Sequence, residues 1–208
     1  MSQLEGRPLP INLDDLTPKR RERATRIVKS ALQILNQGTE YEAIQIREVA
    51  ERANVSLATI YRFYPSKEQL FAATLLEWQE GLRADTNARP LQGSAPARMS
   101  DLALRIIDAF DRGPQYFRLI TALEIAGDPV VKAKLSEEEH LARLMFTGLL
   151  TGYAAADAKA IVDIVLGVMG NSLRRWARGA IDIAQVRDQL TTTLDIVFSA
   201  SAVAHPER

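Results

Sequence analysis

Residues 45–70, QIREVAERANVSLATIYRFYPSKEQL, constrain the fold more than any other part of this sequence. Their apolar residues have the spacing of two short helices, interrupted at Asn54, a residue type that tolerates the left-handed backbone of a tight turn. Ser56 stands at the N-cap position of the second helix, residues 57–64, and Pro65 ends it. Two helices joined by a turn of about three to four residues can place the second one in the DNA major groove. The stretch therefore predicts a helix-turn-helix motif, with an ordinary helical hairpin as the alternative.

Two longer helices are expected on either side of this motif. Ser66 and Gln69 form an S-x-x-Q pattern, which predicts a capping box at the start of a helix from Lys67 to about residue 83. The preceding helix should run from Thr17-Pro18 to about residue 37, because one side of it is apolar and Gly38 can end it. The motif is thus expected to belong to a small helical domain.

Basic residues are concentrated in this part of the chain. Residues 17–64 contain nine Lys or Arg and five Asp or Glu, although the whole chain of 208 residues has a net charge of zero. A basic segment joined to an acidic remainder is the distribution expected where only one end of a molecule meets phosphate. A basic solvated surface without a ligand is the alternative interpretation.

The remaining sequence predicts helices only. Helical apolar spacing recurs, between breaks rich in Gly, Pro and Ser, at residues 98–112, 115–126, 130–150, 155–177 and 182–199. Residues 130–150 are expected to form either one kinked helix or two. We therefore predict an all-α fold with an N-terminal arm (1–16), a three-helix helix-turn-helix DNA-binding domain (17–66) and a C-terminal helical domain (67–208).

Composition excludes several kinds of site. The chain has no cysteine, so disulfides and thiolate metal ligands are ruled out, and its two histidines, His140 and His205, are far apart in sequence. No apolar run reaches the roughly 18 residues of a transmembrane helix, and residues 1–16 lack the apolar core of a signal peptide. We expect a cytoplasmic protein with no membrane partner, no cofactor and no metal.

The segment IREVAERA followed by VSLATIYRFYPSKEQLF resembles the signature of the TetR family of transcriptional regulators. The similarity covers about residues 20–75, and the aromatic-Pro-Ser-Lys-Glu junction makes it more specific than a helix-turn-helix pattern alone. Two positions depart from the family pattern: Ala58 replaces the usual Gly, and Gln45 replaces the usual Thr. The resemblance implies a repressor whose C-terminal domain binds a small effector and forms a homodimer on a palindromic operator.

The predicted DNA contacts lie at the start of the second motif helix and beside it. There, hydroxyl groups can bond bases or phosphates and apolar side chains can touch thymine methyl groups, while the helix start after Ser66 can meet a phosphate. Ile60 and Phe63 are expected in the core instead. The predicted DNA-binding residues are Arg47, Ser56, Leu57, Ala58, Thr59, Tyr61, Arg62 and Lys67. The family resemblance supports Thr59, Tyr61 and Lys67 most strongly.

Large side chains in the C-terminal half either line an effector pocket, as the family resemblance implies, or simply fill a core. The predicted pocket residues are Trp78, Tyr116, Phe117, Met145, Phe146, Met169, Leu173 and Trp176. The predicted dimer interface consists of the last two helices, with Val165, Leu190 and Leu194. The segment NSLRRWARGAIDIAQVRDQLTTTLDIVF resembles the TetR-like repressors of steroid catabolism, which implies a steroid-like molecule, another lipid or an acyl-CoA as effector.

Two other functions remain open from the sequence. One is a helical enzyme that acts on a small apolar substrate, although no nucleophile–base pair, phosphate-binding loop or metal cluster is recognisable. The other is a DNA-binding adaptor without an effector. The prediction is a ligand-responsive DNA-binding regulator without catalytic residues.

Overall fold

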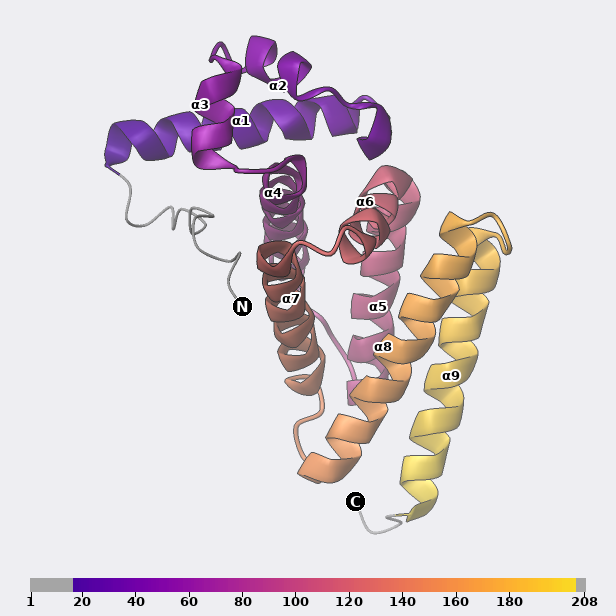
Figure 1. Cartoon of the computed structure of the whole chain (residues 1–208). Helices are drawn as coiled ribbons and strands as arrows, with labels where there is room; N and C mark the ends of the chain where they lie inside the picture. Colours follow the sequence, from indigo (N-terminus) through magenta and orange to yellow (C-terminus); the bar gives the residue numbers. More distant parts are fainter. Residues whose placement is uncertain (1–16, 205–208) are drawn as a thin grey trace, which may run out of the picture. The chain divides into compact units, whose positions relative to one another are not determined.

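The computed structural model describes residues 17–204, and in that range it contains α-helices, one short 3-10 turn and no strand (Figure 1). This confirms the predicted all-α fold. The predicted arm, residues 1–16, lies outside the described residues. The helices are α1 (Pro18–Asn36), α2 (Ile46–Arg52), α3 (Leu57–Phe63), α4 (Lys67–Asn87), α5 (Ala95–Arg112), α6 (Pro114–Ile125), α7 (Pro129–Thr147), α8 (Ala155–Ala177) and α9 (Ile183–Ala204), with the 3-10 turn η2 at Tyr41–Ala43.

The described chain divides into two compact units. Unit 1 contains the residues up to Gly81 together with Leu119–Leu135, and unit 2 contains Leu82–Arg118 and the residues from Ser136 onward. Helices α4, α6 and α7 each contribute residues to both units. The domain boundary expected between residues 66 and 67 stays a prediction.

Unit 1 is built on the apolar side of α1. Ala24, Ile27 and Ala31 are fully buried, and α2 packs on α1 while α3 packs on α2. Tyr64, directly after α3, is buried, and its hydroxyl donates to the carbonyl of Ala24 at 3.4 Å. Gly38 ends α1 with φ 81°, in the left-handed region that glycine enters without strain. The long helix α1 and the two short helices α2 and α3 thereby share one core.

Unit 2 has α8 and α9 side by side, and α9 also packs on α5 (Figure 1). The start of α9 carries a reciprocal capping box: the N–H of Asp182 donates to Gln185 Oε1 at 3.0 Å, and the N–H of Gln185 donates to Asp182 Oδ1 at 2.8 Å. Arg187 on α9 pairs with Asp108 at 2.9 Å and with Asp111 at 2.8 Å on α5. Such half-exposed ion pairs contribute at most about 1 kcal/mol each, so they orient the helices more than they stabilise them.

Two helices differ from their predicted extents. Helix α4 runs on to Asn87 and α5 begins already at Ala95, so the segment without helix is shorter than predicted. The composition of that segment, rich in Pro, Gly and Ala, pointed to a loop, but Pro96 stands at the start of α5, where its missing N–H costs nothing. Residues 129–147 form one α-helix and not two.

Candidate functional site

The turn between α2 and α3 fixes where α3 begins. Asn54 has φ 51°, in the left-handed region, and the N–H of Val55 donates to the carbonyl of Ala50 at 3.0 Å. Ser56 Oγ then accepts the N–H of Thr59 at 3.2 Å, which is the predicted N-cap bond. Gln45, at the N-cap of α2, makes no side-chain cap bond. The departure from Thr at this position therefore removes a capping hydroxyl.

Helix α3 has one buried face and one outward face. Ile60 and Phe63 are only 1% and 3% exposed, which confirms their predicted place in the core. Tyr61, by contrast, is 47% exposed. The exposed or half-buried side chains of α3 and its cap are Ser56, Leu57, Ala58, Thr59, Tyr61 and Arg62. The outward face thus combines hydroxyl, methyl, phenol and guanidinium groups, which suit both base edges and phosphates.

Two hydroxyl groups at the start of α3 are held together. Ser56 Oγ and Thr59 Oγ1 lie 2.9 Å apart in a hydrogen bond in which either oxygen can donate. Each hydroxyl has capacity for a further bond, since it combines one donor with two acceptor lone pairs. The pair is therefore positioned to bond a base or a phosphate without first being ordered.

Lys67 lies in the first turn of α4 and is half-buried. Its Nζ donates to the carbonyl of Glu42 at 3.3 Å and lies 4.5 Å from the ring centroid of Tyr41. Burial lowers the pKa of Lys67, while the nearby charges of Glu42 and Glu68 act in the opposite direction. Lys67 thus ties η2 to α4, and a phosphate would meet an ammonium group that is already held in place. Arg47, in the first turn of α2, is exposed.

The start of α4 is bonded to the turn before α7. Ser66 Oγ accepts the N–H of Gln69 at 3.1 Å, but Gln69 Nε2 donates to Asp128 Oδ2 at 3.1 Å, so only one half of the predicted capping box forms. Ser66 Oγ also donates to Asp128 Oδ2 at 3.4 Å. The other oxygen, Oδ1, accepts the N–H groups of Val130 at 2.9 Å and Val131 at 3.3 Å, which caps α7.

Sequence reasoning missed Asp128 as a connecting residue. The pattern Gly127-Asp128-Pro129 does signal a helix start, because Asp is a favoured N-cap and Pro is favoured at the first helical position. Nothing in the pattern indicates that the second carboxylate oxygen bonds a helix start about sixty residues earlier in the chain.

The predicted pocket residues are mostly buried. Phe146 is fully buried, and Tyr116, Phe117, Met169 and Leu173 are between 2% and 8% exposed. Trp78, Met145 and Trp176 are half-buried. Trp78 belongs to unit 1, whereas the other seven belong to unit 2. Phe117 packs edge-on against Phe110, with ring centroids 5.2 Å apart. Their role as an effector pocket stays a prediction.

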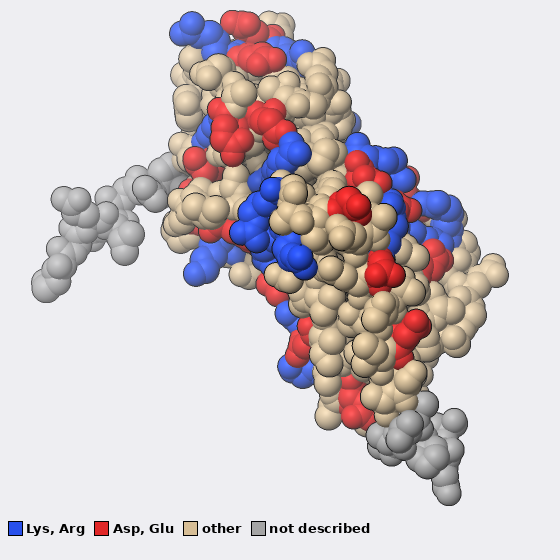
Figure 2. All heavy atoms as spheres, turned by 90° about the vertical axis from the view of Figure 1, so that its right-hand side faces the viewer, with Lys and Arg blue, Asp and Glu red and all other residues tan. Residues whose placement is uncertain are grey.

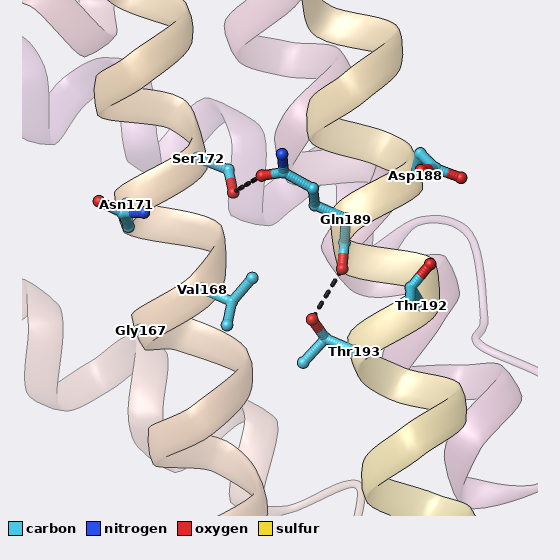
Figure 3. A pocket seen from close by; sticks show the side chains of 8 residues that line it. All are labelled: Gly167, Val168, Asn171, Ser172, Asp188, Gln189, Thr192 and Thr193. Carbon is cyan, nitrogen blue, oxygen red and sulfur yellow. Dashed lines mark hydrogen bonds between the residues drawn. The ribbon is translucent and has the colours of Figure 1, made fainter. Parts of the chain in front are cut away.

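A groove of about 480 Å³ lies between α8 and α9 (Figure 3). Its lining residues are Gly167, Val168, Asn171, Ser172, Asp188, Gln189, Thr192 and Thr193. Ser172 Oγ donates to Gln189 Oε1 at 2.7 Å across the groove floor, so the two helices are also bridged by a hydrogen bond. A Cβ added at Gly167 would meet no atom within 4 Å, which leaves this wall open. The groove is thus shallow, polar and accessible from outside.

The residues predicted for the dimer interface need correction. Val165, Leu190 and Leu194 are 0%, 1% and 4% exposed, so they fill the core of unit 2 and cannot meet a partner. The outward apolar residues on the same helices are Ile164, 47% exposed, and Ile196, 64% exposed. The apolar stripe of each helix was recognised correctly, but periodicity alone does not tell whether a stripe faces its own chain or another one.

Within residues 17–204 there is no cluster of three or more His, Asp or Glu side chains that could hold a metal ion. No helix in the same range is long and apolar enough to cross a membrane.

Comparison with known proteins places these features in a family. Residues 27–74 match the family described as bacterial regulatory proteins, tetR family. The chain is 30% identical over 180 residues to the HTH-type transcriptional repressor KstR of Mycolicibacterium smegmatis, covering 86% of this chain and 88% of that protein. It resembles a TetR transcriptional regulator from Rhodococcus sp. RHA1 with a TM-score of 0.71 and 17% identity, covering 86% of this chain and 96% of the other. It also resembles the regulator FadR from Bacillus subtilis, solved in complex with stearoyl-CoA, with a TM-score of 0.63 and 12% identity, covering 83% and 96% of the two chains.

Proposed function

This chain belongs to the TetR family and is a ligand-responsive, DNA-binding transcriptional repressor, and we propose that it binds a palindromic operator as a homodimer and releases it when an apolar effector binds. The observation that carries the proposal is the outward face of α3. Ser56, Ala58, Tyr61 and Arg62 are exposed there, while the opposite face fills the core. The site of action would be the cytoplasm, where the chromosome lies.

We assign the DNA contacts by position on α3 and its neighbours. Ser56, Leu57, Ala58 and Thr59 are at the N-terminal turn, the part of a recognition helix that reaches base edges. The groups further along and beside the helix, Tyr61, Arg62, Arg47 and Lys67, would bind phosphates. Phosphate contacts position the protein, and base contacts supply the sequence preference.

The homodimer would form through the outer face of α8 and α9. A recognition helix of about two turns reads only a few base pairs, so a specific operator needs a second half-site and a second subunit. The face turned to the viewer in Figure 2 carries Lys, Arg, Asp and Glu interspersed with uncharged surface. Such mixed charge suits a two-fold contact, in which the same patch meets itself. Ile164 and Ile196 would supply its apolar part.

A pair of aspartate substitutions tests this dimer. Ile196→Asp should give monomers by light scattering and weaken operator binding by at least about tenfold, because it places a charge in the interface and a single half-site remains. Ile125→Asp is the matched control, since Ile125 is 80% exposed on α6 and should tolerate the same change. A native protein that is monomeric at micromolar concentration would contradict the interface.

The effector is proposed to be a steroid-like molecule, another lipid or an acyl-CoA. The similarity to KstR and the stearoyl-CoA bound by FadR support this class of ligand. The seven large side chains predicted for the pocket that belong to unit 2 would provide the apolar lining that small-molecule sites need. Binding is proposed to displace α4, which begins directly after the recognition unit at Lys67.

Calorimetry of effector binding with and without operator is the decisive experiment. Steroids, fatty acids and acyl-CoAs that raise the melting temperature would be titrated into the free protein and into the operator complex. If the effector releases DNA, saturating operator must weaken effector binding by the same factor, about 5- to 150-fold or 1–3 kcal/mol. Equal affinities would support a DNA-binding adaptor, and turnover of a ligand would support an enzyme.

A further inference from the structure

A groove along α1 holds positive charge beside the DNA contacts proposed for α2, α3 and Lys67. It has a volume of about 640 Å³ and lies entirely within unit 1. Its lining residues are Pro18, Arg21, Glu22, Thr25, Arg26, Lys29, Ser30, Gln33 and Arg52. Four of these side chains are cationic and one is acidic. Lys29 and Arg52 are exposed, so the charge is accessible to a ligand in solution.

The groove is fixed to the recognition unit by hydrogen bonds. Arg26 Nε donates to the carbonyl of Ala53, the C-cap residue of α2, at 3.0 Å. Arg52 stands in the last turn of α2, and its guanidinium donates to Gln37 Oε1 at 3.4 Å. One wall therefore belongs to α1, and the other belongs to the helix that ends in the turn before α3. A ligand in the groove would lie beside that turn.

The lining indicates which class of ligand fits. Small-molecule sites are lined mainly by apolar and aromatic side chains, and protein interfaces concentrate aromatic residues at their core. This groove contains no aromatic side chain, and every lining residue except Pro18 has a polar or charged side chain. Surfaces that bind DNA are more polar and much more positive than protein interfaces. The chemistry therefore fits a polyanion, and in a DNA-binding protein that polyanion is DNA.

The groove is also long enough for more than one phosphate. The lining residues of α1 extend from Pro18 to Gln33, which at about 1.5 Å per residue spans roughly 22 Å. One strand of duplex DNA carries a negative charge about every 3.4 Å along its axis. Several successive phosphates can thus lie along the groove, whereas a single buffer anion would occupy only part of it.

We propose that this α1 groove binds phosphates that flank the operator core, as a second phosphate site separate from the contacts of α3. The inference rests on the proposed operator binding. In this arrangement α3 reads the core sequence, while Lys29, Arg52 and Arg26 hold the strand as it continues past the α2–α3 turn. The site adds affinity without adding base preference, because it meets only the backbone.

Duplexes of two lengths test the α1 groove. The core would be selected by the wild-type protein from a random duplex library, and compared with the same core extended by about 10 bp on each side, roughly one helical turn. The double variant Lys29→Gln/Arg52→Gln removes two exposed cations from the groove. The control Arg112→Gln/Lys132→Gln removes two exposed cations elsewhere. Circular dichroism and the melting temperature would confirm that both variants are folded.

The expected results differ by duplex. Wild type and control should gain affinity from the extension, and the slope of log affinity against log salt should steepen by about 0.9 for each added phosphate contact. The groove variant should match wild type on the core and lose most of that gain, with its slope on the long duplex smaller by about 2.

Three results would overturn the groove assignment. These are no gain for wild type on the long duplex, an equal gain for the groove variant, or an equal loss for that variant on the core alone. A groove variant that binds both duplexes normally but fails to repress in cells would point to an acidic protein partner instead. Absence of any sequence-selected core would contradict the proposed function itself, so the two failures are distinguishable.

Discussion

The starts of α3 and α4 have the same local chemistry and different surroundings. In each, a serine hydroxyl accepts the N–H three residues later: Ser56 from Thr59 at 3.2 Å, and Ser66 from Gln69 at 3.1 Å. At α3, the serine is exposed, and its hydroxyl also bonds the hydroxyl of Thr59 at 2.9 Å. At α4, the serine and the glutamine both bond the carboxylate of Asp128.

This difference shows that a capping pattern fixes where a helix begins but not what its start is used for. The polar groups at the start of α3 face outward and can bond a ligand. Those at the start of α4 are engaged with the residue that caps α7, so they form a joint within unit 1. Under the proposed function, the first start meets DNA through Ser56 and Thr59. The second start meets DNA only through Lys67, while Ser66 and Gln69 join α4 to α7.

The largest expected effect concerns stability. Asp128→Ala removes the cap of α7, worth about 1 kcal/mol, and charged hydrogen bonds worth about 1.5–3 kcal/mol, so we expect a loss of roughly 2.5–4 kcal/mol. Ser56→Ala removes only a cap and should lose about 1 kcal/mol. Urea unfolding of both variants measures the contrast, with Asp85→Ala as an exposed control on α4. Equal losses for Asp128→Ala and Ser56→Ala would mean that the joint at α4 contributes nothing beyond a cap.

The second prediction concerns DNA affinity, for which the larger effect is expected at the start of α3 and the smaller one at the start of α4. Thr59→Val keeps the shape of the side chain but removes its hydroxyl, and should weaken operator binding about tenfold, or about 1.4 kcal/mol. Gln69→Met, which removes the bond to Asp128, should change operator affinity by less than about twofold. Fluorescence anisotropy with labelled operator measures both.

Thr147→Val is the control for the same chemical change, since Thr147 is exposed at the end of α7 and its hydroxyl donates to the carbonyl of Arg143 at 2.8 Å. A Gln69→Met variant that loses as much affinity as Thr59→Val would show that the two helix starts cannot be separated into a DNA contact and a joint.

Local signals in the sequence predicted the helix-turn-helix well. The turn at Asn54, the cap at Ser56 and the buried Ile60 and Phe63 all follow from side-chain chemistry within a few residues. The reciprocal cap of Asp182 and Gln185 was predictable for the same reason. In each case the partners are close in sequence, so spacing alone brings them together.

Contacts between distant residues were not predictable in this way. The bond from Gln69 to Asp128 depends on how two helix starts meet in space. Likewise, Val165 and Leu190 belong to apolar stripes, but only the packing of α8 on α9 shows that they face inward while Ile164 faces outward. The α1 groove needs Arg52 beside Lys29, which α2 supplies from another part of the chain.

The smallest expected effect is the pH dependence of the joint. Burial alone would raise the pKa of Asp128, but hydrogen bonds from Gln69, Val131, Val130 and Ser66 together lower it below its ordinary value. A depressed pKa in the folded state stabilises the protein above the unfolded pKa of about 4, and this contribution is lost as the pH falls through the folded pKa. The difference in unfolding free energy between wild type and Asp128→Asn should therefore become smaller in acid. This decrease should be smaller than the stability lost in Asp128→Ala, because Asp128 remains partly accessible to water.

Asparagine suits this measurement because it keeps an oxygen for the N–H groups of Val130 and Val131 but cannot gain or lose the charge. Urea unfolding at about pH 6 and about pH 3 gives this difference at both ends of the window. Ser56→Ala is the matched comparison, since the serine cap of α3 does not titrate and its difference from wild type should stay constant. If the stability difference between wild type and Asp128→Asn is also the same at both pH values, the bonds from Ser66 and Gln69 do not depend on the charge of Asp128. The joint at α4 would then be no more than a neutral cap like the one at α3.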